Sequence, residues 1–394
     1  MYNKDIVMFG DFFGHKKNVS HVLAVDIGTA SISAVLAAAY LKENKREILR
    51  IFRYQVNLVA YSNTKESGDR TSHLLKEKLL KAFAEASAAL REISFGHIDL
   101  LLVSFSDPFF LDEKIEKKVF RANLQAPINQ TEINYILKSL EEDAKHSHGS
   151  LAAASSEALA YLVNGYEVTS PIGYKAKSLE VFAALTLITP ILKEYIESAK
   201  NKFFPECSVK YFSDARVLWN ALRLTDNLSE PLLFLDIGGE VTGVFLASSA
   251  GIEHIGAATF GIRTLERRIS ASFGMDHLDA EAMLKMYTAG TLDDPKKDKI
   301  EKIISSALTD WWSEIHKALL RLGIKGLPKK AMVSGGGADF SVFPVFIKEN
   351  MKETDIIILK SEAFKDFFYP SSSNQGSLLG GGDVILSALL LFAI

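Results

Sequence analysis

The sequence predicts an α/β protein built from two related lobes that face one site. Residues 22–36 and 231–246 share one pattern, in which an apolar run ends in Asp-Ile-Gly and a second apolar run follows the turn. Short apolar runs bounded by turn residues are typical of buried strands. Such strands alternate with a helix in the first half of the chain. Because the pattern returns about half a chain later, we interpret the two copies as equivalent strand pairs of two lobes.

The two turns are suited to phosphate and metal. Glycines let backbone N–H groups come close to a phosphate, and an acid at the end of a strand can hold a metal-bound water. A third element, residues 331–339, is a predicted strand that runs into three glycines, and bare backbone of this kind fits a flat ligand such as a nucleoside. A single Asp-Gly turn also occurs in ordinary hairpins, so the prediction depends on all three elements.

Length, charge and cysteine content narrow the class of protein. The chain has 394 residues, enough for two or more domains with their own cores. A net charge of −3, with both signs intermixed, provides no general basic surface, so we expect no nucleic-acid partner. The single cysteine, Cys207, excludes an internal disulfide and fits a reducing, cytoplasmic compartment. No apolar run reaches the ~20 residues of a membrane-spanning helix.

The first lobe follows a short leader. Residues 1–20 carry both charge signs and do not resemble a signal peptide, so we interpret them as a mobile leader. The first part of the lobe covers residues 21–107 and consists of strands around one amphipathic helix. Its predicted elements are strands over 22–40, 47–56 and 98–104 and a helix over 72–93.

The composition changes over residues 108–179. This region predicts a charged strand, a helix capped by Asn129 or Thr131, and two or three more strands. It contains none of the three glycine turns, so we interpret it as a domain inserted into the first lobe. The lobe then resumes over residues 180–228. Its predicted elements there are a strand over 182–189, a helix over 190–202, a strand over 209–212 and a helix from 214.

The remainder forms the second lobe and a final helix. Residues 229–379 contain the second Asp-Ile-Gly turn and the glycine run, and a mainly helical part covers about 262–328. Residues 380–394 predict an apolar helix that we expect to pack back on the first lobe.

In this order the three elements resemble the phosphate-1, phosphate-2 and adenosine motifs of the actin, sugar-kinase and heat-shock-chaperone ATPase superfamily, over nearly the whole chain. The resemblance implies an actin-like ATPase fold, with two ribonuclease-H-like lobes around a nucleotide cleft. Residues 170–173, Ser-Pro-Ile-Gly, followed by a strand, resemble the passage that ends the inserted 1C or SHS2 domain of the FtsA family. The PilM family, which has the same kind of insert, is the second resemblance.

The resemblance assigns roles to individual residues. ATP and Mg²⁺ are the implied cofactors, with Asp26 and Asp236 on the hydrated metal. Asp214 is either the acid that could orient a catalytic water or a helix N-cap. Two members of the implied nucleotide site, Glu281 and Lys285, are four residues apart and also fit a surface ion pair. The full implied set is Asp26, Gly28, Thr29, Ala30, Ser31, Asp236, Gly238, Gly239, Thr242, Glu281, Lys285, Gly335, Gly336 and Gly337.

Three residues depart from the FtsA pattern. Glu240 stands at the third glycine of phosphate-2, Gly243 at its closing aspartate, and Ser31 where many FtsA sequences have a lysine. Two like charges about 4 Å apart repel by roughly 4 kcal/mol at intermediate dielectric, so Glu240 should oppose a triphosphate unless it points outward or acts through Mg²⁺. We therefore expect at most slow ATP hydrolysis.

The FtsA resemblance implies a cytoplasmic scaffold that binds ATP with Mg²⁺, self-associates as a filament or dimer, and recruits division proteins such as the tubulin-like FtsZ. The PilM alternative implies a component of type IV pilus assembly that binds a PilN-like peptide. A sugar or acetate kinase would need an open substrate cleft and no insert, and a nucleotide-free structural protein would have a degenerate pocket at Glu240. We expect no direct membrane contact, because no amphipathic tail follows Ile394. A partner, or a tail missing from this chain, would bring it to the inner face of the cell membrane.

Overall fold

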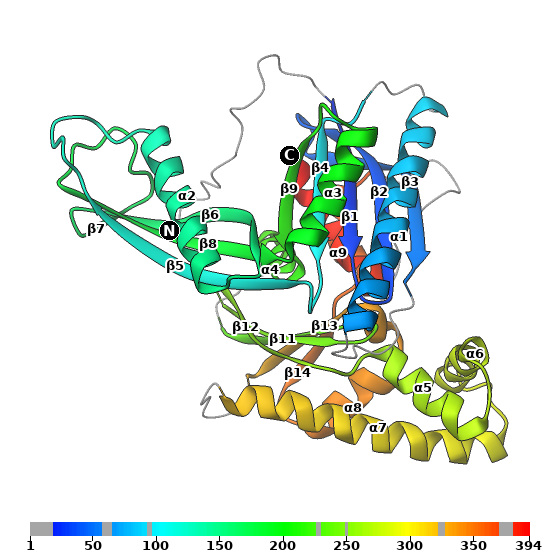
Figure 1. The fold of residues 1–394 in the computed structure, drawn as a ribbon. Coiled ribbons are helices and arrows are strands. Elements are labelled where there is room, and N and C mark those ends of the chain that lie inside the picture. Colours follow the sequence, from blue (N-terminus) through cyan, green and yellow to red (C-terminus); the bar gives the residue numbers. More distant parts are fainter. Residues whose placement is uncertain are drawn as a thin grey trace.

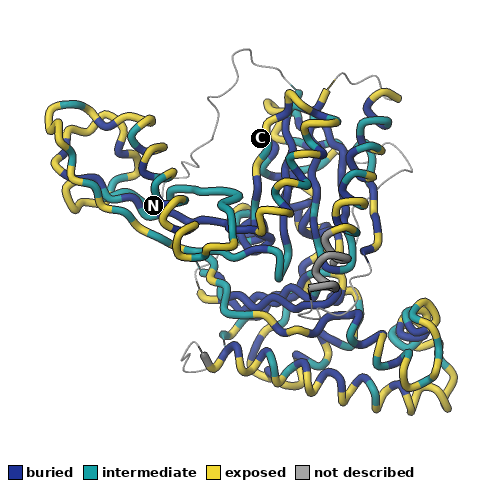
Figure 2. The backbone as a smooth tube through the Cα atoms, viewed as in Figure 1, coloured by how far each residue is buried: buried dark blue, intermediate teal, exposed yellow. Residues whose placement is uncertain are grey.

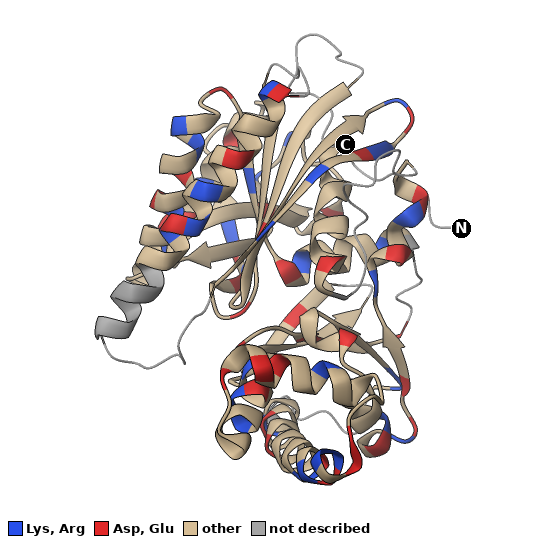
Figure 3. Ribbon diagram, turned by 90° about the vertical axis from the view of Figure 1, so that its right-hand side faces the viewer, with Lys and Arg blue, Asp and Glu red and all other residues tan. Residues whose placement is uncertain are grey.

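The computed structural model describes residues 19–56, 65–92, 97–225, 230–248, 251–321, 328–369 and 381–394. The leader expected over residues 1–20 lies outside this part, apart from its last two residues. No helix within the described ranges is long and apolar enough to cross a membrane. Lys and Arg are interspersed with Asp and Glu along the helices of both lobes (Figure 3), as the intermixed charges of the sequence predict.

A five-stranded mixed sheet forms the centre of the first lobe, in the order β3-β2-β1-β4-β9. β1 pairs antiparallel with β2 and parallel with β4, and this register places Asp26 between Ser33 and Ser104. The strands are β1 (Val19–Ile27), β2 (Ser31–Tyr40), β3 (Lys45–Gln55), β4 (Leu100–Phe105) and β9 (Ser208–Ser213).

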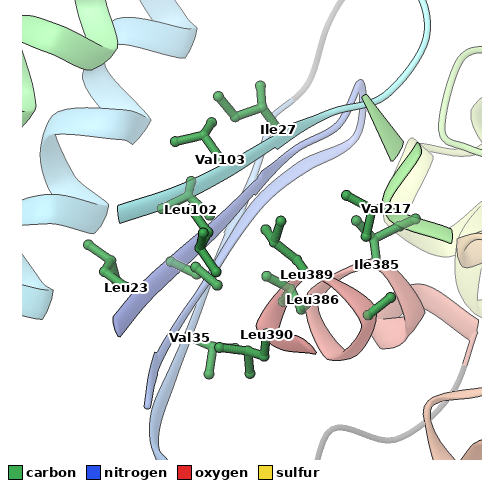
Figure 4. Close-up of a cluster of buried hydrophobic side chains, with 14 of the residues drawn as sticks. Leu23, Ile27, Val35, Leu102, Val103, Val217, Ile385, Leu386, Leu389 and Leu390 are labelled. Atoms are coloured by element: carbon green, nitrogen blue, oxygen red, sulfur yellow. The ribbon is translucent and has the colours of Figure 1, made fainter. Parts of the chain in front are cut away.

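Helices cover both faces of this sheet (Figure 1). α1 (Lys65–Glu92) and α3 (Pro190–Phe203) pack together on one face. α4 (Asp214–Thr225) and the final helix α9 (Val384–Leu390) lie on the other. Figure 4 shows leucines of α9 directed at apolar side chains of β1, β2 and β4. Since every residue of α9 is buried, the C-terminal segment is part of the first-lobe core.

The second lobe repeats the strand order of the first, as β12-β11-β10-β13-β14. Alternate side chains of β10 enter different cores, with Leu232 and Phe234 facing the first lobe and Leu233 and Leu235 facing the second-lobe helices. The strands are β10 (Leu232–Ile237), β11 (Thr242–Ser248), β12 (Gly251–Ala258), β13 (Lys330–Ser334) and β14 (Asp355–Ile358). The helices are α5 (Ile262–Phe273), α6 (His277–Thr288), α7 (Asp294–Arg321) and α8 (Val342–Asn350).

Short 3₁₀ helices complete the chain around the second lobe and the final helix. They are η1 (Gly336–Asp339), η2 (Ser361–Phe367), η3 (Gly381–Asp383) and η4 (Leu391–Ala393).

A third sheet projects from the side of the first lobe (Figure 1). Its order is β5-β8-β6-β7, and α2 (Gln130–Ser147) covers one face. The Asn129 side chain caps α2 by accepting a hydrogen bond from the Glu132 N–H at 3.0 Å. We call residues 110–188 the third-sheet module. Its strands are β5 (Phe110–Phe120), β6 (Ala152–Val163), β7 (Tyr166–Val168) and β8 (Ser178–Ile188).

One strand belongs to a different sheet from the one we expected. The strand predicted over residues 182–189 was expected in the first lobe, but β8 pairs with β5 and β6 from Ser178 to Ile188. The expectation was wrong because alternation of apolar side chains shows that a segment is a strand and not which strands flank it. The module therefore extends past residue 179, where we drew the boundary.

Candidate functional site

Two carboxylates mark the place where β1 and β10 end between the lobes. The Ser104 hydroxyl donates to Asp26 Oδ1 at 3.0 Å, and the Ser334 hydroxyl donates to Asp236 Oδ1 at 2.8 Å. In both sheets the serine lies beside the aspartate on the neighbouring parallel strand. The two copies of the sequence pattern therefore place a serine-bound carboxylate at equivalent points of the two sheets.

Asp214 joins this pair from the first residue of α4. Burial, with a smaller contribution from Asp236, raises the pKa of Asp26 to about 7, and burial raises that of Asp236 to about 6. Burial and the charges of Asp26 and Asp236 raise the pKa of Asp214 well above its usual range. Asp214 Oδ1 is buried without a hydrogen-bond partner in the part of the chain that the structure describes. Ser213 caps α4 by accepting from the Arg216 N–H at 3.3 Å, so Asp214 is not the cap.

This carboxylate cluster suits a hydrated cation. Burial and the smaller mutual repulsion both raise these pKa values, and a positive charge would offset both; Asp214 also has an oxygen available to accept from a metal-bound water. Over the described ranges, no group of three or more His, Cys, Asp or Glu is arranged to hold a bare metal ion. The three carboxylates and the Asp214 oxygen are of the kind that binds the waters of hydrated Mg²⁺, which usually keeps several waters beside phosphates.

The two Asp-Ile-Gly turns have matching hydrogen bonds. The Gly28 N–H donates to the Ser31 carbonyl at 2.9 Å, and the Gly238 N–H donates to the Val241 carbonyl at 3.0 Å. In each turn this hydrogen bond joins the first and last residues, and the two residues between them form the tip of the turn. The same short turn in both lobes accounts for the glycine that follows Asp-Ile in each copy.

The tips of the turns are in direct contact. The Glu240 N–H donates to Thr29 Oγ1 at 3.0 Å, and a Cβ added to Gly239 would lie 2.3 Å from the Ala30 Cβ. The N–H groups of Thr29, Ala30 and Gly239 donate none of the hydrogen bonds found within the described ranges. The turns therefore carry donors for an anion, but a phosphate could enter only after the two turns separate.

The glycine run after β13 packs against the end of β10. Gly335 has φ +84°, and a Cβ there would lie 2.7 Å from Asp236 Oδ1. A Cβ on Gly337 would lie 2.2 Å from Ile237 Cγ2. By contrast, no described atom lies within 4 Å of a Cβ added to Gly336. Two of the three glycines are thus required by the chain itself, and Gly336 alone presents open backbone.

Other expected site residues have hydrogen-bond or ion-pair partners of their own. Thr242 Oγ1 donates to the Phe260 carbonyl at 2.7 Å and accepts from Trp311 Nε1 at 3.0 Å, so its hydroxyl is engaged in the second-lobe core. On α6, Lys285 Nζ lies 2.7 Å from Glu281 Oε1, which is the ion pair that the spacing allowed. The Glu281 carboxylate is mostly buried and its Oε2 also lies 3.6 Å from Arg263 Nη1 of α5.

Sequence reasoning missed a pair that bridges the lobes. His254 Nε2 on β12 lies 3.1 Å from Asp107 Oδ2, in the loop after β4. The charge of Asp107 contributes to the raised pKa values of Asp214 and Asp236, so it belongs to the carboxylate cluster. The two residues are 147 positions apart, and neither lies in a motif.

The same pair explains the departure at Gly243. A Cβ on Gly243 would lie 2.6 Å from Asp107 Oδ2 and 2.6 Å from the Phe245 ring. The space of a side chain at this position is already filled by a carboxylate from the other lobe and by an aromatic ring. A larger residue at position 243 would therefore have to displace Asp107 or Phe245.

Comparison with known proteins agrees with this architecture. No protein-family model matches the sequence, and no curated protein matches it significantly. The chain is similar to a structure of the PilM–PilN type IV pilus biogenesis complex, with 15% identity over 95% of this chain and 98% of that chain and a TM-score of 0.60. The fold is that of the actin-like ATPases.

Two other solved structures show weaker likeness to this chain. The ethanolamine utilization protein EutJ from Carboxydothermus hydrogenoformans has 12% identity over 96% of this chain and 91% of that chain, with a TM-score of 0.47. A non-polymerising mutant of MamK bound to AMPPNP has 10% identity over 95% and 99%, with a TM-score of 0.41.

Proposed function

We propose that this chain binds ATP with Mg²⁺ between its lobes and works as a cytoplasmic scaffold whose nucleotide state controls self-association and partner binding. The observation that carries the proposal is the cluster of Asp26, Asp214 and Asp236 beside two turns with unused N–H groups. ATP·Mg²⁺ combines a cation suited to the carboxylates with an anion suited to the N–H groups.

Each group has a role in this proposal. Asp26 and Asp236 would hold the hydrated metal, and the N–H groups at the turn tips would bind phosphate oxygens. Gly336, with its open backbone, would lie against the nucleoside. Asp214 would orient a water, with turnover that is slow or absent. Because Thr29 contacts Glu240 in this structure, binding would require the lobes to move apart.

Titration calorimetry with ATP and MgCl₂ tests the nucleotide site. We expect heat of binding that is abolished by EDTA and by Asp26→Asn, with circular dichroism showing that the variant is folded. Folded wild-type protein that shows no heat at millimolar ATP·Mg²⁺ would favour the nucleotide-free structural protein. Rapid turnover with a small phosphate acceptor would favour the kinase.

We propose the third-sheet module as the recognition domain, of the 1C or SHS2 type. Its order of one strand, a helix and three further strands supports this assignment, and Figure 2 shows that its far end is largely exposed. Exposed apolar patches commonly mark interaction sites. Large apolar side chains exposed on the module are Phe120, Leu124, Tyr135, Leu159, Tyr166, Ile172 and Tyr174.

The root of the module is linked to the carboxylate cluster. Asp112 of β5 accepts hydrogen bonds from Thr186 of β8, at 2.7 Å, and from Ser213. Ser213 directly precedes Asp214 and caps α4. A shift of the module could therefore move the start of α4, which supports coupling between partner binding and nucleotide.

Two cellular roles fit this scaffold. Likeness over the whole chain to the PilM–PilN structure supports a pilus-assembly component that binds a PilN-like peptide. The Ser-Pro-Ile-Gly passage at residues 170–173 supports the second candidate, an FtsA-like protein that recruits an FtsZ-like partner. Pull-down with a PilN-type peptide and with a tubulin-like division protein separates the two candidates.

Removal of the module tests its role. Because β8 runs to Ile188, the excision should cover residues 110–188, joined by a short Gly/Ser linker. We expect the shortened protein to keep ATP binding and to lose self-association, measured by light scattering. If it assembles as before and only its stability falls, the module is a lid on the first lobe.

A further inference from the structure

Glu240 is held at both its main chain and its side chain. Its N–H donates to Thr29 Oγ1, and its carboxylate is nearly buried, with 7% of the side chain exposed. Arg267 of α5 meets that carboxylate with two parallel hydrogen bonds, Nη1 to Oε1 at 2.8 Å and Nη2 to Oε2 at 2.7 Å. Two-point arginine–carboxylate contacts of this kind are strong and set the orientation of both groups.

The turn and α5 form one unit. The N–H groups of Ile262 and Arg263 donate to the carbonyls of Gly238 and Gly239 at 3.1 and 2.9 Å, so the helix begins on the turn itself. Arg267 lies one turn further along α5 and also donates to Thr264 Oγ1 at 3.0 Å. The helix backbone therefore fixes the guanidinium relative to the turn tip.

This geometry reduces the repulsion between Glu240 and a triphosphate that we expected from the sequence. A carboxylate at the tip of a phosphate turn opposes an anion, but here the carboxylate points to α5 and its charge is matched by Arg267. The N-terminus of α5 carries the positive end of the helix dipole, which also stabilises the negative charge of Glu240. The turn tip thus offers backbone N–H groups without an unbalanced negative charge beside them.

We propose that Arg267 is a positioning residue for nucleotide binding. It holds the Glu240 carboxylate away from the phosphates and balances its charge, and this allows the second turn to bind an anion although it carries a glutamate. The proposal rests on the ATP·Mg²⁺ site proposed above. It predicts that Arg267 matters only while Glu240 is charged.

The experiment compares ATP·Mg²⁺ dissociation constants for wild type, Arg267→Gln, Glu240→Gln and the double variant, by titration calorimetry. We expect Arg267→Gln to weaken binding by about tenfold or more, because it leaves a buried carboxylate unpaired beside the phosphates. Glu240→Gln should bind at least as tightly as wild type. The double variant should recover to within about threefold of Glu240→Gln, since no charge then remains to be balanced.

Arg268→Gln is the matched control. Arg268 is the next residue on α5, and its guanidinium pairs at 2.8 Å with the exposed Asp310, away from Glu240. It should bind as wild type does. Thermal unfolding without nucleotide gives a second readout, in which Arg267→Gln melts at a lower temperature than the double variant.

The outcomes separate this role from the others. A double variant as weak as Arg267→Gln would mean that Arg267 contacts phosphate directly, and the inference would be wrong. Unchanged binding by Arg267→Gln overturns the inference and leaves the ATP site standing. If wild type does not bind, the proposed function fails and this role fails with it.

Discussion

Three successive glycines show how differently neighbouring residues can be constrained. Gly335 and Gly337 touch the end of β10 so closely that a side chain at either would enter Asp236 or Ile237. Gly336, between them, faces open space. The run therefore combines a structural requirement at its ends with one position where backbone is available to a ligand.

Alanine substitutions distinguish these roles. Gly337→Ala should lower the free energy of unfolding by about 1–3 kcal/mol, because its Cβ would overlap Ile237. Gly336→Ala should change it by no more than about 0.5 kcal/mol and should weaken ATP binding. Urea unfolding and calorimetry measure the two effects. A Gly336→Ala variant with unchanged ATP affinity would remove Gly336 from the nucleotide site.

We expect the Asp214 carboxylate to destabilise the folded protein while it serves the proposed function. Its Oδ1 is buried without a partner among the described residues, and Asp26 and Asp236 add repulsion. We expect Asp214→Asn to raise the free energy of unfolding by about 1–3 kcal/mol at pH 8 without metal. Any ATP turnover should be lost. A less stable variant, measured by thermal melting, would show that the hydrogen bond from Ser104 to the Asp214 carboxylate outweighs its burial and repulsion.

At the scale of elements, one buried arginine joins the end of the chain to an edge strand. Arg46 of β3 donates to the carbonyls of Leu390, the last residue of α9, and Leu391, its C-cap, at 3.1 and 2.8 Å. Burial lowers its pKa to about 10, where it stays charged at neutral pH. A cation at a helix C-terminus satisfies carbonyls that have no partner within the helix.

Replacement of this arginine tests the docking of α9. Arg46→Met should cost about 2–4 kcal/mol, since it leaves buried carbonyls without donors. Arg50→Met on the same strand is the control, because Arg50 only pairs with the exposed Glu92 and should cost at most about 1 kcal/mol. Equal losses in urea unfolding would mean that α9 is held by apolar packing alone.

At the scale of the whole molecule, His254 and Asp107 connect the lobes. The centroid of the His254 ring lies 6.0 Å from that of Phe110 and 5.1 Å from that of Phe245. The charge of Asp112 also acts on His254. Burial alone would lower the pKa of His254. The hydrogen bond and charge of Asp107, with that of Asp112, outweigh burial, and the pKa is raised.

A pH dependence follows from the sign of this shift. A raised pKa means that the folded protein holds the proton more tightly than the unfolded chain. The resulting stability is complete below the unfolded value of about 6.5 and is lost as the pH rises through the folded value. The stability difference between wild type and His254→Gln should therefore be larger at about pH 6 than at about pH 9.

The control for this measurement is His316→Gln, on an exposed face of α7. Its stability difference from wild type should be nearly the same at both pH values. If the two variants show the same pH dependence, the bridge between Asp107 and His254 does not hold the lobes together.

The candidate site was predictable where its chemistry lies in short segments. Asp26 and Asp236 followed from the repeated Asp-Ile-Gly pattern, and the structure places both at equivalent strand ends. Glu240 could be recognised as a departure, but its partner Arg267 could not. The two residues are 27 positions apart, and the path of the backbone between them decides whether their side chains meet. No local sequence pattern predicts that path.

The sequence by itself determined the strands, the turns between them and their order along the chain. Alternating apolar residues, the turn glycines and Asn129 at the start of α2 act within a few residues, so their effects can be deduced locally. Only the tertiary structure decided that β8 joins the third sheet, that Asp107 fills the space beside Gly243, and that Thr29 meets Glu240. These contacts join segments far apart in sequence, and they form because packing of the whole chain leaves no other partner within reach.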